Sequence, residues 1–225
     1  MIYEDNSKNK IEYLGEKFSK DLLSYKVIII GRYGVGKTTI IHKLMDKDCD
    51  GEYAPTKTID VKNIQFKVND TIIQLNIWDC CGNDKYALNT PNLFKNASIA
   101  ILVYAINDKE KSFMELKNWY NMLKENSEGS MIFLIGNKND LDKEREVKIE
   151  EAEIYKDNYE DIKIFFETSA LNGNNIDKLL ENIAISIYEK NENDKNDVDI
   201  STRKTIALDK EDFKKKGKKK KKRCC

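Results

Sequence analysis

Gly31-Arg-Tyr-Gly-Val-Gly-Lys37-Thr38 follows directly on Lys26-Val-Ile-Ile-Ile30, a run rich in β-branched residues. This order matches G-x-x-x-x-G-K-[ST] between a strand and a helix, which is the pattern of a phosphate-binding loop. Its glycines let backbone N–H groups turn toward phosphate oxygens, and the N-terminus of the next helix adds positive potential. Lys37 can reach the β and γ phosphates of a nucleotide, and the Thr38 hydroxyl can ligate Mg²⁺. The stretch therefore predicts a nucleotide site at the end of a strand.

Short apolar runs alternate with amphipathic stretches along the middle of the chain. The clearest further runs are Ile99–Val103, Met131–Ile135 and Ile162–Phe166. This alternation is typical of βαβ units around a parallel sheet. Between Val61 and Trp78 two strand-like runs flank the turn dipeptide Asn69-Asp70, which predicts an added antiparallel hairpin. We predict an α/β fold of the P-loop NTPase type, with a six-stranded, mixed, mostly parallel sheet and helices on both faces.

Composition divides the chain into three parts. We expect residues 1–23 to be a flexible N-terminal extension, 24–189 to be one folded domain, and 190–225 to be a disordered tail. The chain has 225 residues, of which 40% are hydrophobic, and this suits one ordinary core. No apolar run approaches the roughly 20 residues of a membrane-spanning helix. We therefore expect the chain in the cytosol, or attached to a membrane from the cytosolic side.

Charge is distributed unevenly between the body and the tail. The 39 basic and 39 acidic residues cancel, but residues 214–223 hold nine basic residues and no acidic one, which leaves 30 basic against 39 acidic residues in 1–213. The negative body argues against nucleic-acid binding there. The five cysteines have no zinc-site spacing.

Three further motifs each follow an apolar, strand-like run. They are Trp78-Asp79-Cys-Cys-Gly82, Gly136-Asn137-Lys138-Asn139-Asp140 and Thr168-Ser169-Ala170. Guanine offers N–H donors at N1 and N2, and the Asp140 carboxylate can accept both. Asn137 can hold the adjoining loops and the acceptor edge of the base, and the Lys138 stem can lie across the ring. Backbone donors of 168–170 can meet the guanine oxygen. The carboxyl ends of parallel strands would bring these motifs together.

The motifs in this order resemble those of the Ras superfamily of small GTPases over residues 25–188, and the nearest branch resembles Rab. Rab-like features are the Trp78-Asp79-x-x-Gly82 junction, Ser112-Phe113 followed by Trp119, and the terminal Cys224-Cys225. The resemblance implies a G domain that binds GTP and GDP with Mg²⁺. The nucleotide-binding residues it implies are Gly31, Arg32, Tyr33, Gly34, Val35, Gly36, Lys37, Thr38, Thr39, Thr56, Asp79, Gly82, Asn137, Lys138, Asp140, Ser169, Ala170 and Leu171.

The same resemblance implies roles in catalysis. Thr38 and Thr56 would ligate Mg²⁺, and Asp79 would hold it through water. Lys37 would stabilise the charge that develops on the γ phosphate, while Thr56 and Asn83 would act beside the attacking water.

Several positions depart from the family pattern. Asn83 stands where a glutamine normally orients the attacking water, and Tyr33 stands where a small residue leaves room for an arginine finger. Both changes predict slow hydrolysis. Cys49 replaces the aromatic residue that clamps guanine, which predicts faster nucleotide release. Lys57-Thr58 and Val61 also differ from the usual Rab residues, so the effector cannot be copied from a relative.

The Lys-rich tail is open to three interpretations: a solvated linker, a nucleic-acid or nuclear targeting patch, or a segment drawn to anionic lipid. The terminal Cys224-Cys225 favours the last, because it resembles the doubly prenylated end of Rabs. The resemblance then implies binding to membrane lipids and a place on the cytoplasmic face of endomembranes, in exchange with the cytosol. The implied partners are effectors, an exchange factor, a GTPase-activating protein, an escort protein and a GDP-dissociation inhibitor. We expect a monomer that does not bind nucleic acid.

These observations lead to a functional hypothesis and two rivals. We expect a Rab-like, membrane-attached switch in vesicle trafficking that hydrolyses GTP, slowly. A non-hydrolysing, GTP-bound adaptor on membranes would follow if Tyr33 and Asn83 abolished turnover. An ATP-dependent phosphotransferase could use the same loop, but Asp140 argues against it.

Overall fold

The computed structural model describes residues 2–4, 9–20, 22–45, 59–80, 82 and 91–193. The chain divides into two compact units, Met1–Ile185 and Ser186–Cys225. The first unit contains one mixed sheet. Its strands are β1 (Ile2–Glu4), β2 (Lys10–Gly15), β3 (Ser24–Ile30), β4 (Asp60–Val68), β5 (Thr71–Asp79), β6 (Ile99–Ala105), β7 (Met131–Asn137) and β8 (Ile162–Glu167).

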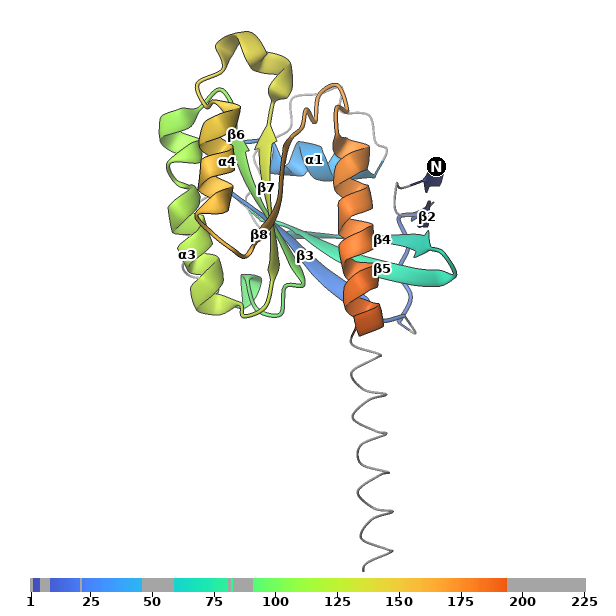
Figure 1. Ribbon diagram of the computed structural model, residues 1–225. Helices are drawn as coiled ribbons and strands as arrows, with labels where there is room; N and C mark the ends of the chain where they lie inside the picture. The colour runs from blue at the N-terminus through green and yellow to red at the C-terminus, as the bar shows by residue number, and fades with distance from the viewer. Residues whose placement is uncertain are drawn as a thin grey trace, which may run out of the picture. The chain divides into compact units, whose positions relative to one another are not determined.

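The strands lie in the order β1-β2-β4-β5-β3-β6-β7-β8 (Figure 1). Strands β5, β3, β6, β7 and β8 run parallel, and β4 pairs antiparallel with β5. The β4–β5 hairpin turns at Asn69-Asp70, where Val68 pairs with Thr71 and Asn69 has a φ of 54°. The predicted α/β class, the mixed and mostly parallel sheet and the hairpin are confirmed.

Helices cover both faces of the sheet. The longer helices are α1 (Lys37–Leu44), α3 (Leu116–Asn126), α4 (Ile149–Asp157) and a helix over 176–193, and the short ones are η1 (Pro91–Leu93), η2 (Lys109–Phe113) and η3 (Asn139–Glu144). Figure 1 shows α3 and α4 on one side of the sheet and α1 on the other. Helix α3 buries Leu116, Trp119 and Leu123, whose spacing makes one apolar stripe.

Strand β6 lies at the centre of the core. All seven of its residues are buried. A parallel strand with helices on both faces loses the alternation of apolar and polar residues, because neither face meets water. The core on the α3 and α4 side includes Trp119, which is fully buried, together with Leu102 and Tyr104 of β6. This rigid centre holds the loops that leave the carboxyl ends of the strands.

The sheet has eight strands, two more than predicted, because the N-terminal segment joins it. Strand β2 pairs antiparallel with β4, with Ile11 opposite Val68 and Tyr13 opposite Phe66, and β1 pairs with β2. Ile11 is fully buried. The flexible extension expected over 1–23 is therefore wrong for β1 and β2. The physical reason is that the edge of β4 offers unpaired backbone groups, which β2 satisfies.

Within the ranges that the structure describes, no helix is long and apolar enough to cross a membrane. The same ranges contain no group of three or more His, Cys, Asp or Glu side chains placed to hold a metal ion by themselves.

Candidate functional site

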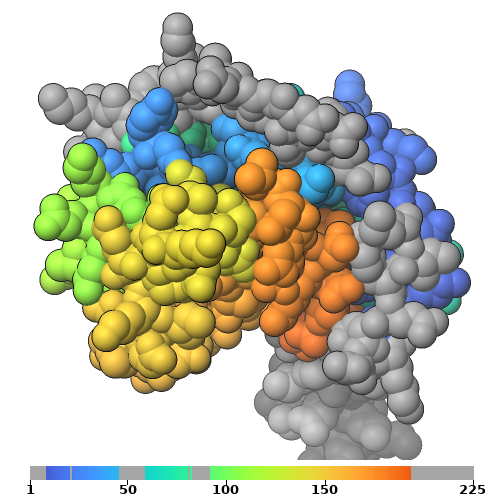
Figure 2. Space-filling model, turned by 90° about the horizontal axis from the view of Figure 1, so that it is seen from above, coloured from blue at the N-terminus to red at the C-terminus, as the bar shows by residue number. Residues whose placement is uncertain are grey.

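The predicted phosphate-binding loop lies between β3 and α1, at the carboxyl ends of the parallel strands. The loops after β5, β7 and β8 reach the same edge of the sheet, since these strands are parallel neighbours. Figure 2 views the domain from above, where the blue surface of the loop and α1 lies next to the yellow surface around residue 140 and the orange surface around residue 170. Four separate segments of the sequence therefore meet here.

Two glycines let the phosphate-binding loop fit against its neighbours. Gly31 has a φ of 138°, and a Cβ there would lie 2.2 Å from the carbonyl oxygen of Val103 in β6. Gly36 has a φ of 96°, and a Cβ there would lie 2.3 Å from Nδ2 of Asn137. Any side chain would collide with backbone at the first position and be strained at both. Gly31 and Gly36 are thus required by close approach to β6 and to Asn137 at the end of β7.

The Lys37 side chain lies inside the loop. Only 6% of the residue is exposed. Its ammonium donates to the backbone carbonyls of Gly31 at 2.8 Å and Arg32 at 3.0 Å. These bonds satisfy a buried charge in the protein alone. The charge therefore sits at the concave side of the loop, where the motif predicts phosphate.

Thr38 and Asp79 bring two oxygen donors together from different segments. The Thr38 hydroxyl donates to Oδ2 of Asp79 at 2.6 Å, and Asp79 is 3% exposed. Asp79 is the last residue of β5 and pairs with Ile29 of β3, so the sheet places it beside the start of α1. A hydroxyl beside a carboxylate is a set of hard oxygen ligands of the kind that Mg²⁺ prefers. The donor set fits the predicted metal.

Gly82 contacts the phosphate-binding loop. Its carbonyl accepts a hydrogen bond from the Tyr33 N–H at 2.9 Å. A Cβ at position 82 would lie 2.1 Å from that same nitrogen, so only glycine fits so close to the loop. The Tyr33 residue is 60% exposed, so its ring stands at the mouth of the site. The Asp-x-x-Gly motif thus reaches the loop through its glycine.

Asn137 joins three loops. Its Nδ2 donates to the Val35 carbonyl at 2.8 Å, and its Oδ1 accepts from the Thr168 hydroxyl at 3.1 Å and the Ala170 N–H at 3.2 Å. It is 1% exposed. A buried amide with such partners fixes the loops rigidly, because breaking any of these bonds would leave a buried polar group without a hydrogen-bond partner.

Asp140 faces the loop after β8. Its Oδ1 accepts from the Ser169 hydroxyl at 2.5 Å, and the Asn139 N–H donates to the Thr168 carbonyl at 3.0 Å. Lys138 has a φ of 69°, which turns the chain sharply between β7 and η3. Leu171, in the next turn, is 68% exposed. The predicted base-binding residues therefore lie on two loops in direct contact.

One expectation about this region needs correction. Residues 168–170 were expected to present backbone N–H groups to guanine. In the structure the N–H of Thr168 bonds to the Gly136 carbonyl, that of Ser169 to the Asn174 carbonyl, and that of Ala170 to Asn137. All three donors are used within the protein, because they close the turn and anchor the loop. The base could meet Ala170 only by sharing its N–H with Asn137.

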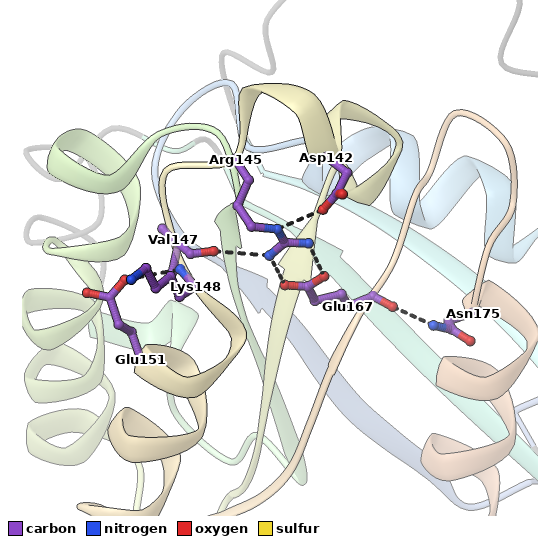
Figure 3. A network of polar contacts seen from close by, with 7 residues as sticks. All are labelled: Asp142, Arg145, Val147, Lys148, Glu151, Glu167 and Asn175. Carbon is purple, nitrogen blue, oxygen red and sulfur yellow. Dashed lines mark hydrogen bonds and ion pairs between the residues drawn. The ribbon is translucent and has the colours of Figure 1, made fainter.

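An ion pair just behind these loops escaped the sequence analysis (Figure 3). Arg145 donates to both carboxylate oxygens of Glu167, at 2.6 and 2.8 Å. Hydrogen bonds to Glu167 raise the pKa of Arg145 above its ordinary value. Glu167 ends β8, directly before the predicted Thr168-Ser169-Ala170 motif. Its position beside that motif could have marked Glu167 as a candidate residue. Its partner could not be found in the same way, because no sequence pattern near Glu167 indicates a contact with Arg145.

Several predicted residues lie outside the described residues. They are Thr56, Asn83 and Cys49, the neighbouring Lys57-Thr58, and the tail with Cys224 and Cys225. Their predicted roles in metal binding, catalysis, nucleotide release and lipid attachment stay predictions.

Comparison with known proteins agrees with this arrangement of loops. A model of the Ras family matches residues 26–189. The "Ras-related protein Rab-13" of Rattus norvegicus is 36% identical over 167 residues, which are 74% of this chain and 81% of the relative. The protein of the same name from Canis lupus familiaris is also 36% identical, and that from Bos taurus is 35% identical, over the same shares.

Proposed function

The chain belongs to the Ras family as a Rab-like small GTPase of vesicle trafficking, which binds GTP and GDP and hydrolyses GTP, and from that premise we propose how its residues divide this work. The observation that carries the proposal is the meeting of Lys37, the Thr38–Asp79 pair and Asp140 at one edge of the sheet. No observation gives comparable support to a non-hydrolysing adaptor. The contact between Asp140 and Ser169 favours a guanine nucleotide over ATP.

Lys37 binds the β and γ phosphates. Its ammonium exchanges the carbonyls of Gly31 and Arg32 for phosphate oxygens when nucleotide enters. The exchange is favourable because the phosphates carry full negative charge. As the bond to the leaving oxygen breaks, the fixed ammonium stabilises the developing charge without moving far.

Thr38 and Asp79, with Thr56, would hold Mg²⁺. When bound, this ion would neutralise charge on the β and γ phosphates. Thr38 acts directly and Asp79 through water. The Thr38 hydroxyl donates to Oδ2 of the buried Asp79 carboxylate, so these two oxygen groups already lie side by side.

Asp140 recognises guanine. Its carboxylate accepts the N1 and N2 hydrogens, while the Ser169 hydroxyl holds it from the other side. The Lys138 stem covers one face of the base. Adenine lacks this pair of donors, so it would leave the carboxylate poorly paired.

Two segments of the chain, one on each side of the γ phosphate, distinguish GTP from GDP. Gly82 lies against the phosphate-binding loop at Tyr33, and its N–H would respond to an added phosphate. Thr56 would respond from the other side. Asn83 orients water less well than glutamine because it is one methylene shorter, and hydrolysis is therefore slow.

The tail attaches the switch to membranes. Two prenyl groups on Cys224 and Cys225, together with the basic stretch 214–223, give stable anchoring where one chain would not. The protein then works on the cytoplasmic face of endomembranes and cycles through the cytosol. Its partners are effectors, an exchange factor, a GTPase-activating protein, an escort protein and a GDP-dissociation inhibitor.

A single-turnover experiment tests this proposal. The purified full chain is loaded with radiolabelled GTP or ATP, and phosphate release is followed with Mg²⁺ and after chelation by EDTA. We expect tight binding of GTP only, slow phosphate release with Mg²⁺, and rapid loss of nucleotide after chelation. Equal binding of ATP would contradict the role of Asp140, and retention of nucleotide in EDTA would contradict the metal site.

A further inference from the structure

Arg145 and Glu167 form a two-pronged ion pair behind the proposed guanine site (Figure 3). Nη1 and Nη2 of Arg145 donate to Oε1 and Oε2 of Glu167 at 2.6 and 2.8 Å. The side chains are only 20% and 11% exposed. Paired, parallel bonds of this kind fix both distance and rotation between the two groups. The pair is therefore a rigid connection rather than a loose surface contact.

Each partner is itself held by further bonds. Arg145 also donates from Nε to Asp142 at 2.8 Å and from Nη1 to the Val147 carbonyl at 3.0 Å. The backbone carbonyl of Glu167 accepts from Nδ2 of Asn175 at 2.7 Å. Asn175 directly precedes the helix over 176–193. The ion pair thus ties the end of η3 to β8 and to the start of that helix.

Packing sets the orientation of Glu167. Gly136 of β7 is paired with Glu167 across the sheet. A Cβ at position 136 would lie 3.1 Å from Cγ of Glu167 and 2.6 Å from the hydroxyl of Tyr104. The stem of Glu167 therefore lies close over the glycine, and its carboxylate points to Arg145 with little freedom. A preset carboxylate loses little entropy in holding the guanidinium.

The ion pair joins the same two segments that carry the proposed base-binding groups. Asp140 is the second residue of η3, which Arg145 follows directly, and Ser169 follows Glu167 by two residues. The Ser169–Asp140 hydrogen bond and the Arg145–Glu167 pair are thus two connections between one pair of segments. Without the ion pair, the carboxylate of Asp140 would keep its nearer contacts but lose the anchor at the far end of η3.

A second ion pair at the other end of β8 offers a matched comparison. Lys124 donates to Asp161 at 2.6 Å, and Asp161 directly precedes β8. Tyr120 also donates to Asp161, at 3.1 Å. This pair connects α3 to β8, far along the strand from Asp140. The same strand therefore has a charged anchor at each end, and only one of them adjoins the base-binding loops.

We infer that Arg145 and Glu167 are positioning residues that hold Asp140 in place for guanine, and so determine nucleotide residence time and base discrimination. The inference rests on the proposed role of Asp140. Neither residue touches the base: they act through the geometry of η3. The ligand chemistry concerned is a guanine nucleotide, as opposed to a nucleotide whose base lacks the N2 amino group.

The test measures nucleotide release from the full chain loaded with fluorescent GDP or with fluorescent inosine diphosphate, which lacks the N2 amino group. Glu167→Gln removes the more buried anion of the network and leaves Arg145 with the exposed carboxylate of Asp142. We expect Glu167→Gln to speed GDP release about tenfold, or about 1.4 kcal/mol. Release of inosine diphosphate should speed up less, so the ratio between the two nucleotides should shrink. Arg145→Lys keeps the charge but loses the two-pronged geometry, and it should give an intermediate effect.

The control is Asp161→Asn, which breaks the anchor at the other end of β8. It should lower the thermal unfolding midpoint about as much as Arg145→Lys does, with unchanged release of both nucleotides. Equal acceleration for both nucleotides, or a loss of stability without faster release, would overturn the inference. Arg145→Lys keeps this readout available if Glu167→Gln does not fold. Asp140→Asn is measured in parallel: if it leaves GDP release unchanged, the proposed function fails at the base site, which is a separate result.

Discussion

The carboxyl ends and the amino ends of the parallel strands hold their charged groups in different ways. At the carboxyl ends Lys37 and Asp79 are buried, and among the described residues no other charged residue is. Toward the amino ends Lys26 donates to the carbonyls of Asn92 and Lys95, and Lys124 pairs with Asp161 while 47% of its side chain stays exposed. Burying a charged group costs free energy, so buried charged residues are found mainly where the charge serves a function. The comparison separates the residues proposed for nucleotide chemistry from charged residues that stabilise the fold.

The largest expected effect is at Lys37. Lys37→Ala removes the buried ammonium of the phosphate-binding loop, and hydrolysis of GTP should fall by about 10²- to 10³-fold, as for other preorganised donors. The measurement is single-turnover phosphate release at saturating GTP. Lys26→Ala is the control at the other end of β3, where the ammonium donates to the carbonyls of Asn92 and Lys95. Lys26→Ala should change thermal stability alone. A comparable loss of hydrolysis in this variant would contradict the distinction between the carboxyl and amino ends of the strands.

The next effect is on base choice. Asp140→Asn replaces an acceptor of two N–H groups with an amide that can donate, so affinity for GTP should fall by at least about 100-fold. Xanthine nucleotides, which offer an acceptor in place of the N2 amino group, should then bind better. Competition binding with both nucleotides checks the switch. An unchanged preference for GTP would mean that the base lies elsewhere.

A third prediction concerns the lateral edge of the sheet. Ile11→Ala deletes a fully buried side chain of β2, which packs where the N-terminal segment joins the sheet. The free energy of unfolding should fall by about 2–5 kcal/mol, as for other large-to-small core changes. Denaturant unfolding of the GDP-loaded protein measures it, and GDP release should not change. If stability were unaffected, the N-terminal strands would contribute nothing to the fold.

The smallest effect is expected at the residue that should orient water. Asn83→Gln restores the longer amide and should raise intrinsic hydrolysis by less than about tenfold, since the catalytic cation and metal ligands are unchanged. Combining it with Tyr33→Ser should be required before an activating protein has a large effect, because the Tyr33 ring is exposed at the mouth of the site. The predicted roles of Asn83 and Tyr33 would be contradicted if the wild-type protein hydrolysed GTP as fast as a Rab that has the glutamine and were stimulated as strongly by an activating protein.

More of the candidate site than of the sheet could be predicted from the sequence. The loops carrying Lys37, Asp79, Asn137 and Asp140 were predicted from their own residues, because each motif is a short run placed after a strand. The two extra strands were missed because residues 1–22 as a whole are polar and mixed in charge, and the partner of β2, β4, lies about fifty residues away. Ile11 and Tyr13 alternate with charged residues over only a few positions, so the local signal is short, and the stability of the strand comes from the open edge it covers.

The motifs alone were enough to predict an α/β nucleotide-binding fold and to propose residues for contact with phosphate and base, since spacing and residue chemistry are local properties. Two features depended on the folded chain. The Ala170 N–H is used by Asn137, and Arg145 is paired with Glu167 across twenty-two positions. Hydrogen-bond partners of this kind are set by which strands lie side by side, and the periodicity of a sequence does not encode that arrangement.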